Sequence, residues 1–196
     1  MADETHPQGR ILASGRASEI VLLDEHRVLR RVHGRGHHAL EAALMRHARA
    51  HGYPVPEVHE VRPDGLVMER ILGGTMWDDL CRNPSRAASH AGTLAELHRR
   101  LHRISPPPEA PARYGEPQPG NVLLHGDLHP LNVMLSPLGP VVVDWTNAGR
   151  GPGGADVADT WLVLEAAAAF DELLAPGLRR SFEEAFLAAA GRSVAA

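Results

Sequence analysis

The sequence predicts an α+β fold in two lobes, a small β-rich lobe followed by a mainly helical one. Three observations lead to this prediction. The first third holds short apolar and β-branched runs separated by turn signals, the remainder is dominated by helix-type periodicity, and Gly73 and Gly74 stand where the character changes. We therefore expect one domain over residues 1–73 and a second over residues 74–196.

The first lobe is predicted to contain strands around one helix. Residues 11–33 form two strands around a turn at Asp24 and Glu25. The next segment has apolar residues at helical spacing and ends at Gly52. Two more strands flank the turn signal PDG. The helix and these two strands are expected at residues 37–52, 53–61 and 65–71.

The second lobe is predicted to be helical with a small hairpin inside it. A helix over residues 86–104 is stopped by a proline-rich loop, and two short apolar strands follow at 122–125 and 141–144. From Asp156 onward the chain is rich in Ala and Leu, which predicts two helices broken at Pro176 and Gly177. The acidic pair of the last helix, Glu183 and Glu184, is expected on a solvated face.

Composition excludes several classes of protein. The formal net charge of the 196 residues is −4, and nucleic-acid-binding proteins normally carry a basic excess, so no nucleic-acid partner is expected. The one cysteine, Cys81, cannot form an intramolecular disulfide. The first ten residues lack an apolar signal core, and no window approaches the ~20 apolar residues of a membrane span. We therefore expect a cytoplasmic protein without membrane contact.

Three polar side chains in residues 122–145 form the most informative group. Asp127 and Asn132 lie in a polar segment between two apolar runs, and Asp144 ends the second run. Strand ends hold side chains rigidly, and the loop between them can turn polar groups toward one point. Because Mg²⁺ prefers carboxylates, waters and phosphates as ligands, this grouping predicts a magnesium site with one carboxylate left to accept a proton.

The spacing of these residues matches the requirements of phosphoryl transfer. In protein kinases an aspartate is followed five residues later by an asparagine, and a metal-binding aspartate lies on the next strand. Asp127 and Asn132 keep this spacing, and Asp144 lies twelve residues further on. Positioning, metal charge and a base that orients the nucleophile supply most of the acceleration in such reactions.

With these motifs the sequence resembles the aminoglycoside phosphotransferase and choline kinase-like family, relatives of the protein kinases. HGDLHPLN looks like the catalytic loop of that family, and VVVDW looks like its metal-binding DFG segment. The resemblance implies a protein kinase-like fold in which Asp127 is the catalytic base and Asn132 and Asp144 hold Mg²⁺. It also implies that Asp156 hydrogen-bonds the backbone of the catalytic loop.

The first third resembles the nucleotide-binding lobe of the same family. By this resemblance Gly15 belongs to the phosphate-covering loop, and Arg30 takes the place of the phosphate-pairing lysine with Glu41 as its helix partner. The segment from Glu69 to Ile71 resembles the linker whose backbone holds the adenine edge, which suits GTP as well as ATP. All 20 basic residues of the chain are arginine, so an arginine at a lysine position does not by itself indicate lost function.

The predicted function is therefore ATP-dependent phosphotransfer to a hydroxyl group of a small molecule. Aminoglycosides, other antibiotics, choline-like alcohols and sugars all remain open as acceptors, and the sequence does not indicate an oligomeric state. Two alternatives stay open. A non-catalytic, pseudokinase-type module is favoured by the single glycine of the phosphate loop, by Arg30 and by the short stretch after Asp144. A metal-dependent hydrolase would use His125, Asp127 and His129 as a metal cluster.

Overall fold

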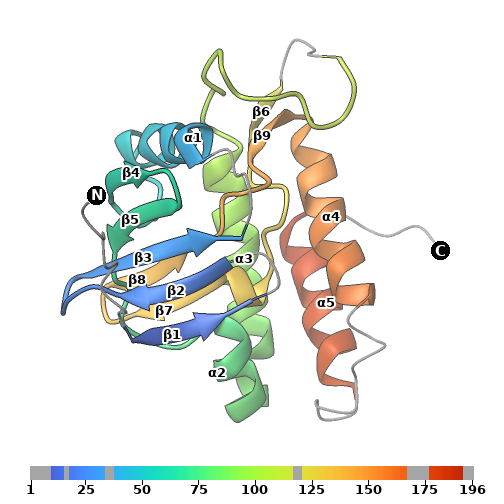
Figure 1. Ribbon diagram of the computed structural model, residues 1–196. Helices are drawn as coiled ribbons and strands as arrows, with labels where there is room; N and C mark the ends of the chain where they lie inside the picture. Colours follow the sequence, from blue (N-terminus) through green and yellow to red (C-terminus); the bar gives the residue numbers. More distant parts are fainter. Residues whose placement is uncertain (1–9, 16–17, 34–37, 117–120, 167–176, 192–196) are drawn as a thin grey trace, which may run out of the picture.

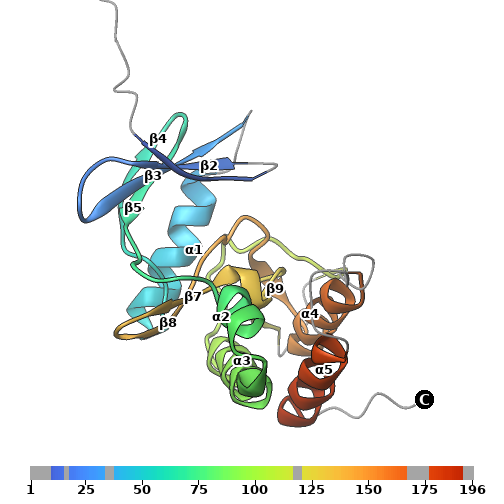
Figure 2. The ribbon, with the colours of Figure 1, turned by 90° about the horizontal axis from the view of Figure 1, so that it is seen from below.

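A computed structural model describes residues 10–15, 18–33, 38–116, 121–166 and 177–191 of the chain. The strands of the first part and the helices of the second form separate groups, which lie side by side in two views (Figures 1 and 2). This arrangement confirms the predicted α+β class, with a small β-rich lobe and a mainly helical lobe.

The first lobe is an antiparallel sheet of five strands covered by one helix. The order of the strands across the sheet is β1-β2-β3-β5-β4. Helix α1 (His38–Ala50) packs against β4 and β5, and its apolar side chains join those of the sheet in one core (Figure 2). The strands are β1 (Ile11–Ser14), β2 (Ser18–Leu22), β3 (Arg27–Val32), β4 (Val58–Arg62) and β5 (Gly65–Glu69).

The prediction of two strands in residues 11–33 is wrong, because the structure has three. The chain turns between β1 and β2, where the Gly15 amide donates a hydrogen bond to the Ser18 carbonyl at 2.8 Å. The turn expected at Asp24 is confirmed. Its carboxylate accepts hydrogen bonds from the amides of His26 and Arg27 at 2.9 and 2.8 Å, as aspartate commonly does in turns.

In its described residues, the second lobe contains four helices and two small sheets. Strand β7 pairs with β8, and β6 pairs with β9. The predicted strands 122–125 and 141–144 therefore exist but have partners that the sequence analysis did not predict. The helices are α2 (Met76–Arg82), α3 (Ala87–Leu101), α4 (Gly153–Ala166) and α5 (Leu178–Ala189). The strands are β6 (Val122–Leu124), β7 (Val133–Ser136), β8 (Gly139–Val142) and β9 (Gly149–Gly151), and single 3-10 turns are η1 (Pro84–Arg86) and η2 (Pro130–Asn132).

Helix α3 runs through the middle of the second lobe and packs against α5 (Figure 1). The apolar face expected on this helix is buried, which confirms the helical periodicity. Phe182 and Phe186 of α5 close the other side of this core. Helix α5 begins after Gly177, which has a left-handed φ of 83°, while Pro176 lies outside the described residues.

The linker between the lobes runs from Glu69 to Met76. Gly73 has a φ of 133°, and a side chain there would collide with the Leu135 carbonyl oxygen, so the position requires glycine. The Leu135 amide donates to the Gly74 carbonyl at 2.8 Å, which attaches the linker to β7. The linker therefore positions the sheet over the β7–β8 hairpin. The domain boundary at residue 73 stays a prediction.

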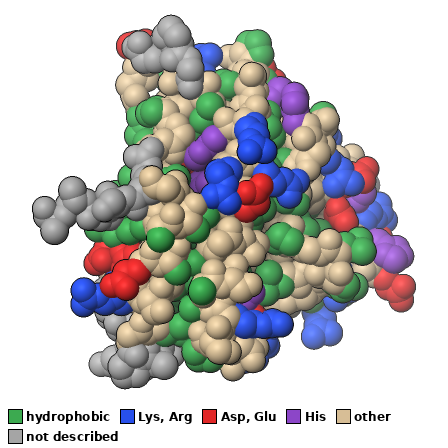
Figure 3. All heavy atoms as spheres, turned by 180° about the vertical axis from the view of Figure 1, so that it is seen from behind, with side chains coloured by type: hydrophobic (Ala, Val, Ile, Leu, Met, Phe, Trp, Pro, Cys, Tyr) green, Lys and Arg blue, Asp and Glu red, His purple; other side chains and the backbone are tan. Residues whose placement is uncertain are grey.

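The surface carries its basic groups unevenly. Figure 3 shows arginine side chains gathered near the middle of the face opposite to the view of Figure 1.

Within the described part of the chain, no helix has the length and apolar character needed to cross a bilayer.

The expectation that Glu183 lies on a solvated face is wrong. Glu183 is only 5% exposed and lies where α5 faces α4. Its carboxyl group shares a hydrogen bond with that of Glu165 in α4. Arg179 also contacts Glu183, at 3.0 Å. Burial and the neighbouring Glu165 carboxylate raise the pKa of Glu183 to about 7. Glu184, the next residue, is exposed as expected and pairs with Arg180.

The free energy of unfolding should therefore fall as pH rises between about 5 and 7. An unfolded glutamate titrates near 4.3, so in this window the folded chain keeps a proton that the unfolded chain has lost. One such proton gives a slope of up to about 1.4 kcal/mol per pH unit. Urea unfolding from pH 5 to 8 tests this expectation, with Glu184→Gln as the control. Glu183→Gln should flatten the dependence, and an unchanged slope in that variant would contradict the assignment.

Candidate active site

The loop after β6 is shaped by a glycine that brings Asp127 to the surface of the second lobe. Gly126 has a φ of 75°, and a Cβ atom there would lie 2.5 Å from the Asn147 carbonyl oxygen. A side chain would therefore clash with backbone in a conformation that already favours glycine. The turn is followed by η2, which ends at Asn132.

Asp127 and Asn132 contact each other directly. The Asn132 Nδ2 donates to the Asp127 carbonyl at 2.9 Å and approaches its carboxylate at 3.4 Å. The His129 Nε2 lies 3.3 Å from the other carboxylate oxygen. Partial burial opposes ionisation of Asp127, but the hydrogen bonds with His129 and Asn132 keep its pKa below the usual value. The Asp127 carboxylate is therefore ionised at neutral pH.

Asp144 follows β8 in a left-handed conformation, with a φ of 61°. Such a conformation costs a residue with a side chain roughly 1–2 kcal/mol, and aspartate tolerates it better than most residues do. The Val143 amide, one residue earlier, donates to the Asn132 carbonyl at 3.0 Å. Trp145, one residue later, is buried and donates to the Val142 carbonyl. These neighbours hold Asp144 beside the Asp127–Asn132 loop, with its side chain 43% exposed.

Arg30 connects the sheet, helix α1 and Asp144. Its Nη1 donates to both carboxylate oxygens of Glu41, at 2.9 and 2.8 Å, and its Nη2 donates to the Asp144 Oδ1 at 2.9 Å. The Arg30 and Glu41 side chains are only 6% and 8% exposed. Burial raises the pKa of Glu41, and the positive charge of Arg30 opposes that shift. The predicted pairing of Arg30 with Glu41 is thus present in the structure.

Thr146 is a part of this group that the sequence analysis did not predict. Its hydroxyl accepts a hydrogen bond from the Arg30 Nη2 and donates one to the Asp144 Oδ1 at 2.7 Å. Glu41, Asp144 and Thr146 together engage both terminal nitrogens of Arg30. The position of Thr146 two residues after Asp144 was the available signal, because a hydroxyl at that distance can reach back to the carboxylate.

A buried carboxylate supports the loop from below. Asp156, in α4, accepts hydrogen bonds from the amides of Gly126 and His125 at 2.7 and 3.3 Å, as the resemblance implied. His102 and His98 of α3 lie 2.9 and 3.5 Å from its Oδ2. Burial alone would favour the neutral acid, but the hydrogen bonds with these histidines hold the pKa of Asp156 far below the usual value.

The roles of the two histidines of α3 were missed in the sequence. The spacing of His98 and His102 places them on one face of the helix, but nothing local indicates that this face meets Asp156. His98 also bonds the Thr160 hydroxyl, which donates to the Leu128 carbonyl. The catalytic-loop segment is thereby attached to α3 and α4 at several points.

The remaining candidate residues lie in the first lobe and in the linker. Gly15 is at the β1–β2 turn, next to residues 16 and 17, which are outside the described part of the chain. The Glu69 carboxylate accepts from the Glu57 amide and lies near Arg49, and the Glu69 amide donates to the Glu57 carbonyl at 2.8 Å. Among the described residues, the Ile71 amide has no acceptor.

The arrangement gives no support to a cluster of His125, Asp127 and His129. His125 is buried, its Nε2 bonds the Val143 carbonyl at 3.1 Å, and its ring packs against Trp145. Burial lowers the pKa of His125, so the ring is neutral and acts as a structural support. Among the described residues, the group of three with metal-ligating geometry is instead His98, His102 and Asp156.

Asn132 and Asp144 suit a hard divalent cation. The amide nitrogen of Asn132 is bound to Asp127, which leaves its amide oxygen as a ligand. Asp144 uses Oδ1 for Arg30 and Thr146, and within the described residues its Oδ2 has no hydrogen-bond partner. Two oxygen ligands completed by water and phosphate oxygens are the arrangement in which Mg²⁺ usually binds.

Comparison with known families decides the relationship. The model of the phosphotransferase enzyme family matches residues 8–121 and 116–196. The chain belongs to the phosphotransferase enzyme family.

Curated and solved relatives agree with this membership. A probable serine/threonine-protein kinase of Archaeoglobus fulgidus, a BUD32 homolog, is 32% identical over 97 residues, which are 50% of this chain. The match spans only 38% of that relative's length. About half of the chain is thus matched to a little over a third of a longer protein.

Solved structures resemble the fold of this chain at low sequence identity. An amicoumacin kinase in complex with AMP-PNP, Ca²⁺ and Ami has a TM-score of 0.66 at 15% identity, covering 95% of this chain and 73% of the other. An aminoglycoside-3'-phosphotransferase of type VIII gives 0.61 at 20%, covering 92% and 90%. A choline/ethanolamine kinase family protein from Mesorhizobium loti gives 0.60 at 18%, covering 97% and 71%. These similarities establish a kinase-like fold.

Removing one member of the buried Arg30–Glu41 pair should destabilise the protein more than removing both. Arg30→Met leaves a buried carboxylate unpaired, which costs about 3–5 kcal/mol of unfolding free energy. Arg30→Met with Glu41→Leu should recover most of that loss, because no buried charge remains. Arg31→Met, which breaks a partly exposed pair with Glu19, is the matched control and should cost under about 1 kcal/mol. Additive losses in urea unfolding would contradict this reading.

Asp156→Asn should lower the unfolding free energy by about 3 kcal/mol or more at pH 7, because the amide that replaces the buried carboxylate cannot accept all the hydrogen bonds from His102 and from the amides of His125 and Gly126. Asp159→Asn, on the same helix but partly exposed, should cost less than about 1 kcal/mol. Chemical unfolding of both variants measures the difference. Equal effects of the two substitutions would show that Asp156 is not an anchor of the loop.

Proposed function

We propose that this phosphotransferase transfers the γ-phosphate of ATP to a hydroxyl group of a small molecule. Asp127 is the catalytic base, and Asn132 and Asp144 are the Mg²⁺ ligands. The observation that carries the proposal is the contact of Asp127 with Asn132 beside an Asp144 that Arg30 links to the first lobe. On this proposal residues 1–73 bind the nucleotide, and residues 74–196 supply the base and bind the acceptor.

Asp127 acts as the residue that orients and deprotonates the acceptor hydroxyl. Because its carboxylate is ionised at neutral pH, it can accept a hydrogen bond from that hydroxyl and then its proton as the bond to phosphorus forms. His129 and Asn132 hold the carboxylate in place. When bound, Mg²⁺ neutralises charge on the phosphate oxygens and aligns them for in-line attack.

The nucleotide base is expected at the linker. The Ile71 amide, without an acceptor among the described residues, can donate a hydrogen bond to the purine edge, and the Glu69 carbonyl can accept one. Gly15 belongs to the turn that would cover the phosphates. Because this recognition uses backbone groups, GTP fits the proposal as well as ATP.

The ligands bound by proteins of similar fold support a small-molecule acceptor. Solved structures of similar fold include an amicoumacin kinase and phosphotransferase complexes with gentamicin and streptomycin. The proline-rich loop contributes Pro111 and Arg113 to a pocket of about 440 Å³ that also borders Glu41 and Thr146. We expect this loop to take part in acceptor binding. The acceptor class stays open between antibiotics, sugars and amino alcohols.

A non-catalytic nucleotide-binding module is the second candidate, favoured by one observation. The terminal nitrogens of Arg30 bind Glu41, Asp144 and Thr146, so Arg30 must release Asp144 to contact a phosphate with Nη2. A panel of hydroxylated antibiotics, sugars and amino alcohols, with ATP consumption as the readout, separates the two. A catalyst consumes ATP with at least one acceptor, whereas a binding module consumes none and still binds nucleotide.

Asp127→Asn should abolish transfer while leaving nucleotide affinity within about threefold of the parent. The amide keeps the shape of the side chain but cannot accept the proton, which commonly costs 10²-fold or more in rate, roughly. Measurement combines single-turnover rates with calorimetric titration of AMP-PNP in the presence of Mg²⁺. Retained turnover in this variant would remove Asp127 from the proposal.

Asp144→Ala should instead weaken Mg²⁺-dependent binding of AMP-PNP by about tenfold or more, since a carboxylate ligand of the ion is lost. Titrations with and without Mg²⁺ give the comparison. The parent should show a strong dependence on Mg²⁺, and the variant a small one. Glu184→Gln, which removes an exposed carboxylate elsewhere, is the control for net charge. If both variants kept the Mg²⁺ dependence, Asp144 would not be a ligand.

A further inference from the structure

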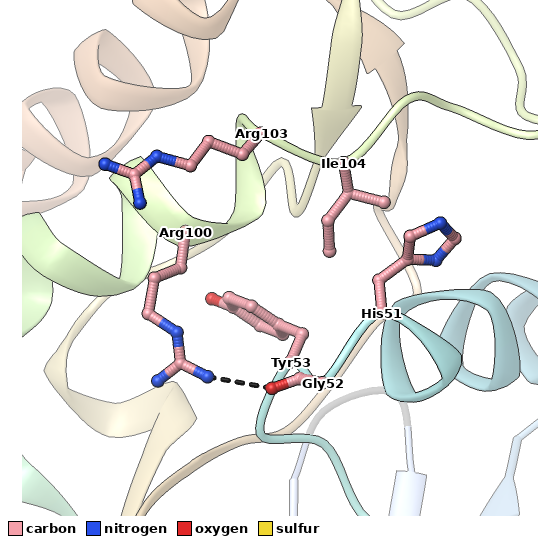
Figure 4. Close-up of a pocket in the computed structure, with 6 residues that line it drawn as sticks. All are labelled: His51, Gly52, Tyr53, Arg100, Arg103 and Ile104. Carbon is pink, nitrogen blue, oxygen red and sulfur yellow. Dashed lines mark hydrogen bonds between the residues drawn. The ribbon is translucent and has the colours of Figure 1, made fainter.

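A second pocket lies outside the candidate active site, where the ends of helices α1 and α3 meet (Figure 4). Its volume is about 250 Å³. It is lined by His51, Gly52, Tyr53, Arg100, Arg103 and Ile104. None of the residues assigned above to nucleotide, metal or catalysis borders it, so its chemistry has to be explained separately.

The charges around this pocket are positive. Arg100 lies in the last turn of α3 and Arg103 in the turn that follows the helix, and both side chains line the pocket. Figure 4 shows both guanidinium groups on the side of the Tyr53 ring that carries the hydroxyl. No aspartate or glutamate lines the pocket, so the two positive charges are not neutralised within it.

One of the two arginines is already held in position. The Arg100 Nη2 donates to the Gly52 carbonyl at 2.8 Å, and its guanidinium carbon lies 5.9 Å from the centre of the Tyr53 ring. The remaining N–H groups of Arg100 have no partner among the described residues. The Arg103 guanidinium has no hydrogen-bond or ionic partner among them either. A ligand would therefore meet one pre-oriented and one available guanidinium group.

Tyr53 supplies a third donor. The residue is 3% exposed, and its hydroxyl has no hydrogen-bond partner among the described residues. Burial, with the negative charge of Asp156, raises the pKa of Tyr53 well above its usual value, so the hydroxyl keeps its proton. A buried donor without an acceptor is unfavourable, and an anion can satisfy it directly or through a bridging water.

We propose that this pocket binds the phosphate group of a small phosphorylated molecule or inorganic phosphate. Guanidinium groups form paired, charge-assisted hydrogen bonds with phosphate oxygens, and two of them suit a doubly charged anion. The volume exceeds that of a phosphate group and leaves room for a small organic body. The aromatic ring of Tyr53 and the side chain of Ile104 provide an apolar surface for it.

Binding in this pocket would connect two functional parts of the molecule. His51 and Gly52 directly follow α1, the helix that carries Glu41, the partner of Arg30. Arg100 comes from the end of α3 and Arg103 from the turn after it, next to His98 and His102, which contact Asp156. An anion between these ends holds the two helices together at the junction of the lobes.

Calorimetric titration with inorganic phosphate and with glycerol 2-phosphate tests the proposal at constant ionic strength. Saturating AMP-PNP and Mg²⁺ are present, so that phosphate cannot report on the nucleotide site. We expect saturable binding that Arg103→Gln weakens by about tenfold or more, the effect of losing one charge-assisted hydrogen bond. Tighter binding of glycerol 2-phosphate than of inorganic phosphate would identify a phosphorylated molecule as the ligand.

Arg180→Gln is the matched control, because Arg180 is exposed and lies on α5, away from the pocket lining. It removes the same charge and should change the affinity by less than about twofold, since an exposed charge outside the site is screened by salt. Tyr53→Phe keeps the ring and removes the donor, and it should weaken binding while thermal unfolding shows a folded chain. Equal affinities for Arg103→Gln and Arg180→Gln, or no saturable binding to the parent, would overturn the proposal.

Discussion

The guanidinium of Arg30 is the interaction on which the rest of the candidate site depends. It is buried in the first lobe, yet one of its terminal nitrogens reaches Asp144 in the second. Because a buried guanidinium needs its hydrogen bonds satisfied, the relative position of β3, α1 and the segment after β8 is constrained by one side chain. A shift of either lobe would separate the Arg30 guanidinium from Asp144 and Thr146, while its pair with Glu41 lies within the first lobe.

A second constraint acts from the opposite side of the loop. Asp156 accepts hydrogen bonds from the amides of His125 and Gly126 and bonds the ring of His102. A fully buried charge thus fixes the backbone just before Asp127. The solvent-facing polar groups of the loop are thus held in position by buried polar groups beneath it. This division explains how a surface loop without regular structure can present a carboxylate in a defined orientation.

Local features of the sequence were sufficient for some of this arrangement. The sequence predicted that Asp127 and Asn132 turn toward one point, since both lie in a short loop between two strands, and the structure brings them into contact. The helical periodicity of α3 was equally clear. Pairing over long distances was not: β9 is a three-residue Gly-Arg-Gly strand without an apolar pattern, and its partner β6 is distant in the chain.

The burial of Glu183 and the role of Thr146 depend in the same way on neighbours that are remote in sequence. Glu183 has the polar spacing of an exposed helix face and becomes buried only because α4 packs against it. Thr146 follows its first partner, Asp144, by two residues in the sequence, but its second partner, Arg30, is 116 residues away. A single sequence gives the hydrophobic periodicity of a helix or strand, but it leaves open which other element packs against it.

The exclusive use of arginine in this chain has a consequence for how the site responds to alkaline conditions. A lysine in the position of Arg30 can be neutralised by burial, since an ammonium group loses its proton readily in an apolar environment. A guanidinium group keeps its charge at every pH at which the protein is folded. Any alkaline limb in a rate profile would therefore report on the acceptor or on another group, and not on the cation between the lobes.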